Sequence, residues 1–193
     1  HRPTRRAFLI PAGTNQMHGL PALTPAGSSR ANDISDFNLT VGAADFGLST
    51  TPFASNKPVR AVMWTPNTTS IVNLGTLGNA HHSSEALAVN SHADIVGWSG
   101  TAFHAIAPST GPSIGPVTGS ISTRAFIWRD GVMTDLNTRL LPNSGWILHV
   151  AADVNDEGQI VGWGTRLGNT AASPTRIRAF LLTPMPLDSD MDR

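Results

Sequence analysis

A five-residue segment recurs four times along this chain of 193 residues, and it constrains the fold more than any other sequence feature. Each copy begins with Arg-Ala and continues with three apolar residues. The copies start at Arg6, Arg60, Arg124 and Arg178, so the intervals between them are 54, 64 and 54 residues. Self-similarity of this kind is the signature of an array of similar structural units. The chain is therefore expected to fold as a repeat domain.

Two further elements recur between the Arg-Ala segments. One combines a polar turn with an apolar stretch that reads Ile-Val-Gly-Trp in two of its copies, at 34–42, 89–98 and 154–163. The other is the stretch 132–136, which matches 71–74 and, less closely, 16–20. Turn residues such as Asp130-Gly131 separate the apolar segments, which is the pattern of β-hairpins. No stretch has a 3.6-residue apolar period, so we expect almost no helix.

These segments predict an all-β fold made of four-stranded units. Four strands repeated around an axis suggest a small β-propeller-like domain, here with three full repeats plus one strand. The alternative is a β-trefoil-like barrel, which also contains three four-stranded repeats. The predicted boundaries are an N-terminal extension 1–5, a repeat domain 6–184 and an acidic C-terminal tail 185–193. The repeats lie near 6–59, 60–123 and 124–177, with a closing strand 178–184.

The stretches 124–136 and 154–163 resemble the HAF repeat of bacterial extracellular proteins. That repeat usually opens with His-Ala-Phe, whereas Arg replaces the His in all four copies here. The stretch 73–78 also resembles the family's Asp-Leu-Gly-Thr-Leu-Gly. The resemblance implies a secreted or cell-surface protein with a propeller-like fold. It implies no catalytic residues, because the family has no established common activity.

The composition excludes several classes of protein. Lys plus Arg and Asp plus Glu both number 13, and this balance is unlike the basic excess of nucleic-acid-binding proteins. There is no Cys, which rules out disulfides, thiolate metal sites and cysteine nucleophiles. No apolar run approaches the ~18 residues that a membrane span requires. The sequence also lacks a Gly-x-Ser-x-Gly elbow, a P-loop and a dinucleotide fingerprint. We therefore expect no catalysis.

Three sets of residues are candidate metal ligands. His81 and His82 form the one histidine pair, near Glu85. Asp188, Asp190 and Asp192 alternate as in the first half of a calcium loop, but the glycine and the later acidic ligand of such a loop are missing. His1 resembles the N-terminal copper ligand of some secreted enzymes. No cofactor is expected, and calcium or copper are the ions that these residues would suit.

Tryptophan and arginine are the remaining candidates for ligand contacts. Trp98 and Trp163 end equivalent segments, while Trp146 lies outside the repeat pattern. Equivalent tryptophans usually pack in the core, but they can also stack on sugar rings. The four repeated arginines can bind main-chain carbonyl groups of a neighbouring unit or face an anionic ligand.

The expected function is therefore a secreted or cell-surface repeat domain that mediates protein interaction or self-assembly. An incomplete unit leaves an unpaired strand edge, and such edges recruit partners. The expected partner is a second copy or another surface protein, and no nucleic acid. The alternatives are a carbohydrate-binding propeller module and a secreted metal-dependent enzyme.

Overall fold

The computed structural model describes residues 5–46, 58–66, 70–78, 82–101, 123–166 and 176–185. In these ranges the chain forms four antiparallel β-sheets. The one helical element among them is the short 3-10 helix η1 (Leu136–Arg139). The predicted all-β class is thus confirmed, because short apolar segments separated by turn residues pair as hairpins. No helix in the described ranges is long and apolar enough to cross a membrane.

The sheets are named A to D in chain order. Sheet A pairs β1 (Phe8–Leu9) and β2 (His18–Gly19). Sheet B has the strand order β3 (Ser29–Ile34), β4 (Thr40–Asp45), β5 (Val59–Trp64) and β6 (Ile71–Gly75). Sheet C has the order β7 (Ser84–Val89), β8 (Ile95–Gly100), β9 (Thr123–Arg129) and β10 (Val132–Asp135). Sheet D has the order β11 (Trp146–Val154), β12 (Ile160–Arg166) and β13 (Arg176–Leu182).

The grouping of strands differs from the predicted three full repeats plus one strand. Among the described residues, two sheets have four strands, sheet D has three and sheet A has two. In sheets A, B and C the Arg-Ala strand does not end a unit, because it pairs with the segment that follows it. In sheet C this pairing is the hairpin of β9 and β10, closed by Asp130 and Gly131, both of which have a positive φ. Sheets B, C and D therefore each cross the boundary of a sequence repeat, whereas sheet A lies within the first one.

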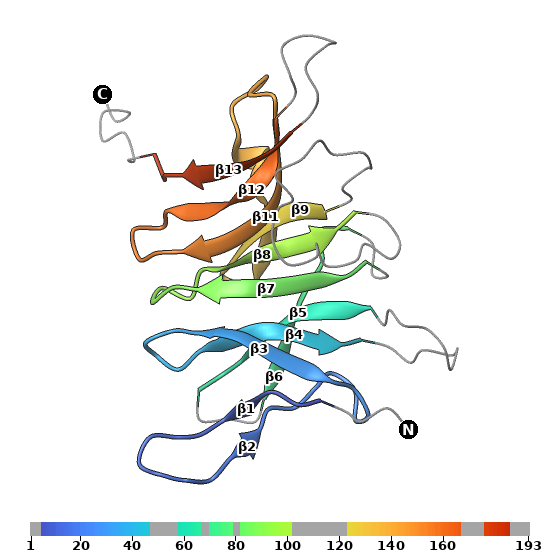
Figure 1. Cartoon of the computed structure of the whole chain (residues 1–193), viewed down its shortest axis with the longest axis vertical. Helices are drawn as coiled ribbons and strands as arrows, with labels where there is room; N and C mark the ends of the chain where they lie inside the picture. Colours follow the sequence, from blue (N-terminus) through green and yellow to red (C-terminus); the bar gives the residue numbers. More distant parts are fainter. Residues whose placement is uncertain are drawn as a thin grey trace.

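The sheets stack in chain order, and an apolar layer fills each of the three interfaces (Figure 1). We call the face of a sheet toward the next sheet its forward face, and the opposite one its backward face. Between B and C, for example, Val41 and Ala61 of the forward face meet Ile95 and Phe126 of the backward face. Alternation along each strand supplies both faces with apolar side chains. The sheets of the described residues close into neither a ring nor a barrel.

A β-bulge recurs at the same place in the first strand of sheets B, C and D. The bulge bends the first strand toward the glycine of the Val-Gly pair on the second strand. At Gly97, an added Cβ atom would lie 2.0 Å from the carbonyl oxygen of Glu85. The repeated glycine is therefore required by close approach of two main chains.

Polar contacts connect successive sheets at both ends of their strands. The Ser84 hydroxyl accepts a hydrogen bond from the Ala61 N–H (3.0 Å) and donates one to the Gly75 carbonyl (2.5 Å). At the turn ends of the strands, the Asp33 carboxylate accepts a hydrogen bond from the Val89 N–H (2.9 Å). These contacts satisfy main-chain groups at the interfaces and align each sheet with the next.

Candidate functional site

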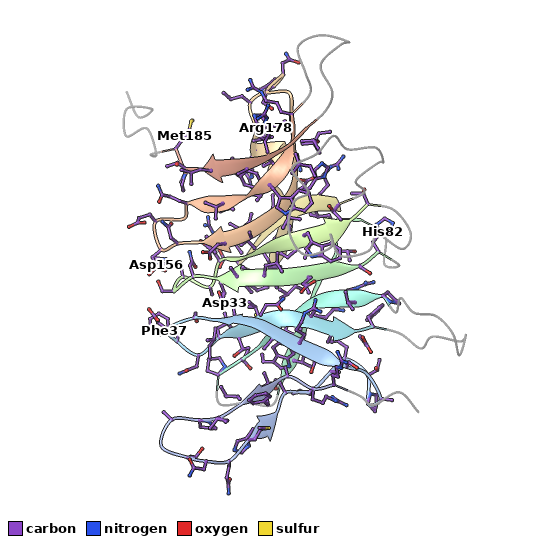
Figure 2. The ribbon with its side chains drawn as sticks, viewed as in Figure 1. Asp33, Phe37, His82, Asp156, Arg178 and Met185 are labelled. Carbon is purple, nitrogen blue, oxygen red and sulfur yellow. The ribbon has the colours of Figure 1, made fainter. Side chains whose placement is uncertain are left out.

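The predicted metal residues do not form a centre in the described ranges. His1, His81, Asp188, Asp190 and Asp192 all lie outside the described residues. His82 is half-buried, on the side of the molecule opposite Asp33 and Asp156 (Figure 2). No group of three or more His or acidic side chains in the described ranges is placed to hold an ion.

The structure places the three candidate tryptophans in different surroundings. Trp98 is only 2% exposed, so its indole cannot stack on a ligand, and its prediction as a ligand contact is wrong. The repeat position puts it inside the sheet stack, where a neighbouring sheet covers it. Trp163 is half-buried, and its ring centroid lies 5.8 Å from that of His149.

Trp146 is half-buried at the start of β11. Its ring packs against the apolar layer between sheets C and D. The Arg166 guanidinium lies 5.9 Å from the ring centroid, at the outer range of a cation–π contact. This tryptophan therefore has a packing role, and part of its surface stays accessible.

Two of the four repeated arginines, Arg6 and Arg60, bind the connections between sheets. Arg60 is buried, stacks 4.2 Å above the ring centroid of Phe46 and donates a hydrogen bond to the His82 carbonyl. Burial lowers the pKa of Arg60 from its ordinary value. Arg6 donates similarly to the Pro25 carbonyl (2.6 Å). Both carbonyl groups lie where the chain leaves one sheet for the next, so these two arginines support the stack.

The exposed apolar side chains at the C-terminal end of the stack form the first candidate interaction site. On the forward face of sheet D, Val161 is 44% exposed and Leu181 is 60% exposed, and Ala179 is exposed beside them. We call these three residues the terminal face. The residues at the same repeat position as Val161 are Val41 and Val96, and both are 0% exposed because the next sheet covers them.

Sheet A shows the same contrast at the N-terminal end. On its backward face, Phe8 is 54% exposed, whereas Phe126 at the same repeat position is 0% exposed. Ile10 is also exposed. Beside β1 lies a pocket of about 540 Å³, lined by residues 5–8, 28–31 and 43–45 and by Val59. Exposed apolar faces and pockets of this kind are typical of interaction sites.

Sequence reasoning did not identify these two end faces as sites. Phe8 and Phe126 occupy equivalent motifs, and nothing in the motif indicates that only one of them is covered. The available signal was the incomplete unit, which predicted an unpaired strand edge but not an exposed apolar face.

His149 is a buried titratable group in the interface between sheets C and D. Its Nδ1–H donates to the Thr123 carbonyl (2.9 Å), so its Nε2 accepts from the Thr165 hydroxyl (3.0 Å). Burial lowers the pKa of His149, and the charge of Arg124 lowers it further, against the opposing effect of the Thr123 carbonyl. At neutral pH the folded state therefore holds the neutral imidazole.

This geometry predicts that the free energy of unfolding falls as the pH drops below about 6.5, the pKa of an unfolded histidine. The unfolded state then binds a proton that the buried ring resists. Urea denaturation at a series of pH values between about 7 and 5 measures the slope. His149→Gln should flatten the slope. An equal slope in wild type and His149→Gln would contradict the assignment.

Searches against protein families, curated proteins and solved structures found no match for this chain. The candidate site therefore rests on the geometry of the two ends of the stack. At both ends, repeat positions that are buried in the central sheets are exposed.

Proposed function

We propose that this chain is a non-catalytic repeat domain that mediates protein interaction and self-assembly through the ends of its sheet stack. The partner proposed here is a second copy, whose sheet A packs its backward face on the terminal face. The proposal of a secreted or cell-surface location rests on the resemblance to HAF repeats. The same resemblance supports the proposal that the four sheets are blades of a propeller-like array.

The observation that carries the proposal is the burial of equivalent residues. Three times within the chain, the forward face of one sheet packs on the backward face of the next. Sheet D has the same kind of forward face, with Val161 and Leu181 largely exposed. Sheet A has the same kind of backward face, with Phe8 and Ile10 exposed. A head-to-tail contact between copies would repeat an interface that the fold already contains.

Replacing Val161 or Leu181 by aspartate is expected to abolish self-association. A buried unpaired carboxylate opposes packing of the terminal face on another sheet. Sedimentation equilibrium over a concentration series measures the mass. The wild-type mass should rise with concentration, while either variant should keep the monomer mass at concentrations about tenfold higher.

Val132→Asp is the matched control, because Val132 is also exposed but lies on the outer strand β10. This variant should associate like the wild type. A wild-type chain that remains monomeric at every concentration would overturn the proposal of self-assembly. Equal loss of association in Val132→Asp and Val161→Asp would show that the terminal face is not the interface.

A further inference from the structure

β1 lacks the neighbour that its equivalents have. In sheets B, C and D the Arg-Ala strand pairs along one edge with the Val-Gly strand, as β4 pairs with β5, β8 with β9 and β12 with β13. Among the described residues, β1 pairs with β2 alone. The edge on which a Val-Gly strand would lie is therefore open in the described part of the chain.

The main chain of Phe8 points toward this open edge. The Leu20 N–H donates to the Ala7 carbonyl (2.7 Å), and the Ser29 hydroxyl bridges the Ala7 N–H and the Leu20 carbonyl, so Ala7 and Leu20 occupy a hydrogen-bonding position of the antiparallel ladder. Pairs alternate along such a ladder, so Phe8 opposite Gly19 is a non-hydrogen-bonded pair. The N–H and carbonyl of Phe8 are thus directed away from β2, as an added strand requires.

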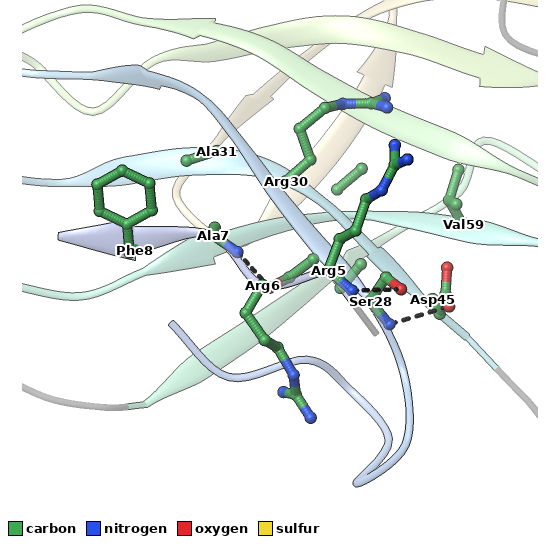
Figure 3. Close-up of a pocket in the computed structure, with 12 residues that line it drawn as sticks. Arg5, Arg6, Ala7, Phe8, Ser28, Arg30, Ala31, Asp45 and Val59 are labelled. Atoms are coloured by element: carbon green, nitrogen blue, oxygen red, sulfur yellow. Dashed lines mark hydrogen bonds between the residues drawn. The ribbon is translucent and has the colours of Figure 1, made fainter. Parts of the chain in front are cut away.

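The pocket beside this edge has a cationic wall (Figure 3). The side chains of Arg5 and Arg30 extend in the same direction, and that of Arg6 extends away from them. Arg30 forms an ion pair with Glu85. Within the described residues, no carboxylate pairs with Arg5. A carboxylate from a bound strand would therefore find a guanidinium group available at Arg5.

The internal repeats indicate which sequence fits the open edge. In sheet D the Phe180 ring lies over Gly162, where an added Cβ atom would come within 2.7 Å of the ring. Phe180 and Phe8 occupy the same repeat position, so a glycine opposite Phe8 leaves room for its ring. The register of β4 against β5 pairs Gly42 with Val62 and Asp45 with Val59. A separate strand with the sequence of β4, paired with β1 in the same register, would bring Gly42 opposite Phe8 and Asp45 opposite Arg5.

We infer that the pocket beside β1 binds an extended polypeptide strand, antiparallel to β1, that carries a glycine opposite Phe8 and a carboxylate opposite Arg5. The carboxylate lies on the same face as the Arg5 side chain, since directly opposed residues of a ladder share a face. This inference rests on the proposed function, because it identifies a class of partner at the N-terminal end of the stack. Its site is separate from the terminal face.

The probe is a fluorescein-labelled synthetic peptide with the sequence of residues 38–46, titrated with the whole chain and followed by fluorescence anisotropy. The peptide should bind, and its Asp45→Lys version should bind roughly fivefold more weakly, as expected for one exposed ion pair. Arg5→Glu should reverse this preference between the two peptides. Arg139→Glu is the matched control, since Arg139 is an exposed arginine on η1, and it should leave the preference unchanged.

Methylation of main-chain nitrogens in the peptide tests strand addition separately from charge. N-methylation at Gly42 removes the donor that faces the Phe8 carbonyl and should abolish binding, whereas N-methylation at Ala43 should not.

An unbound peptide, or a preference unchanged by Arg5→Glu, would overturn the inference. Titrations in the Leu181→Asp background keep the chain monomeric. If the peptide does not bind but the wild-type chain still self-associates, the strand-binding site is refuted and the proposed function is not affected.

Discussion

Gly97→Ala is expected to destabilise the fold by about 3 kcal/mol or more, a loss in the upper range for single substitutions. The new methyl group would lie 2.0 Å from the Glu85 carbonyl oxygen, and both groups belong to the main-chain framework of sheet C. Neither can move without opening the bulge between β7 and β8. Urea denaturation of the variant and the wild type, followed by circular dichroism, measures the difference.

Gly19→Ala is the control for this prediction. Gly19 is a strand glycine with no atom within 4 Å of an added Cβ, and it needs no positive φ. Its replacement should change the free energy of unfolding by no more than about 0.5 kcal/mol. Similar effects of the two substitutions would mean that close approach at Gly97 does not determine stability.

Arg129→Met is expected to cost about 3 kcal/mol, because it leaves a buried carboxylate without its partner. Arg129 Nε and Nη2 donate to Asp94 Oδ1 and Oδ2 at 2.5 and 2.6 Å. Asp94 is only 4% exposed, and Asn90 also donates to it. Denaturant midpoints at neutral pH measure the loss. The double variant Asp94→Asn with Arg129→Met should recover part of the stability, because no unpaired charge remains.

The ion pair of Asp94 and Arg129 also predicts that the free energy of unfolding falls at acidic pH. The hydrogen bond from Arg129 holds the pKa of Asp94 below its ordinary value. The pair therefore stabilises the fold above the unfolded pKa of about 3.9, and this contribution is lost as the pH falls toward the lower folded value. The double variant should lose this dependence. The pH dependence due to Asp94 lies at lower pH than the one expected from His149, so a single pH series separates the two groups.

The sequence was sufficient to predict most of the local structure. Turn residues and short apolar segments indicated hairpins, whereas the close approach that requires the repeated glycine became visible only in the structure. The sequence did not show the strand grouping, because the Arg-Ala segment has apolar neighbours on both sides along the chain. Pairing of β9 with β10 decided that question.

The candidate site was less accessible to sequence reasoning. Trp98 and Trp163 have the same motif, yet Trp98 is buried under the next sheet and Trp163 is half-buried. The repeated arginines were open to two interpretations, and Arg60 now lies over Phe46 with its guanidinium bound to a carbonyl group. In both cases the neighbouring sheet determines the role of the side chain, and the sequence motif does not indicate which sheet is its neighbour.

The sequence by itself determined the repeat, the all-β class and the absence of any cysteine-based chemistry. These follow from residue types and spacing, which act locally along each strand and turn. Only the tertiary structure decided which copies of the repeat are covered. Val41, Val96 and Val161 are chemically identical, and their exposure depends on whether another sheet packs on them. Burial is a property of two surfaces in contact, so a single strand cannot specify it.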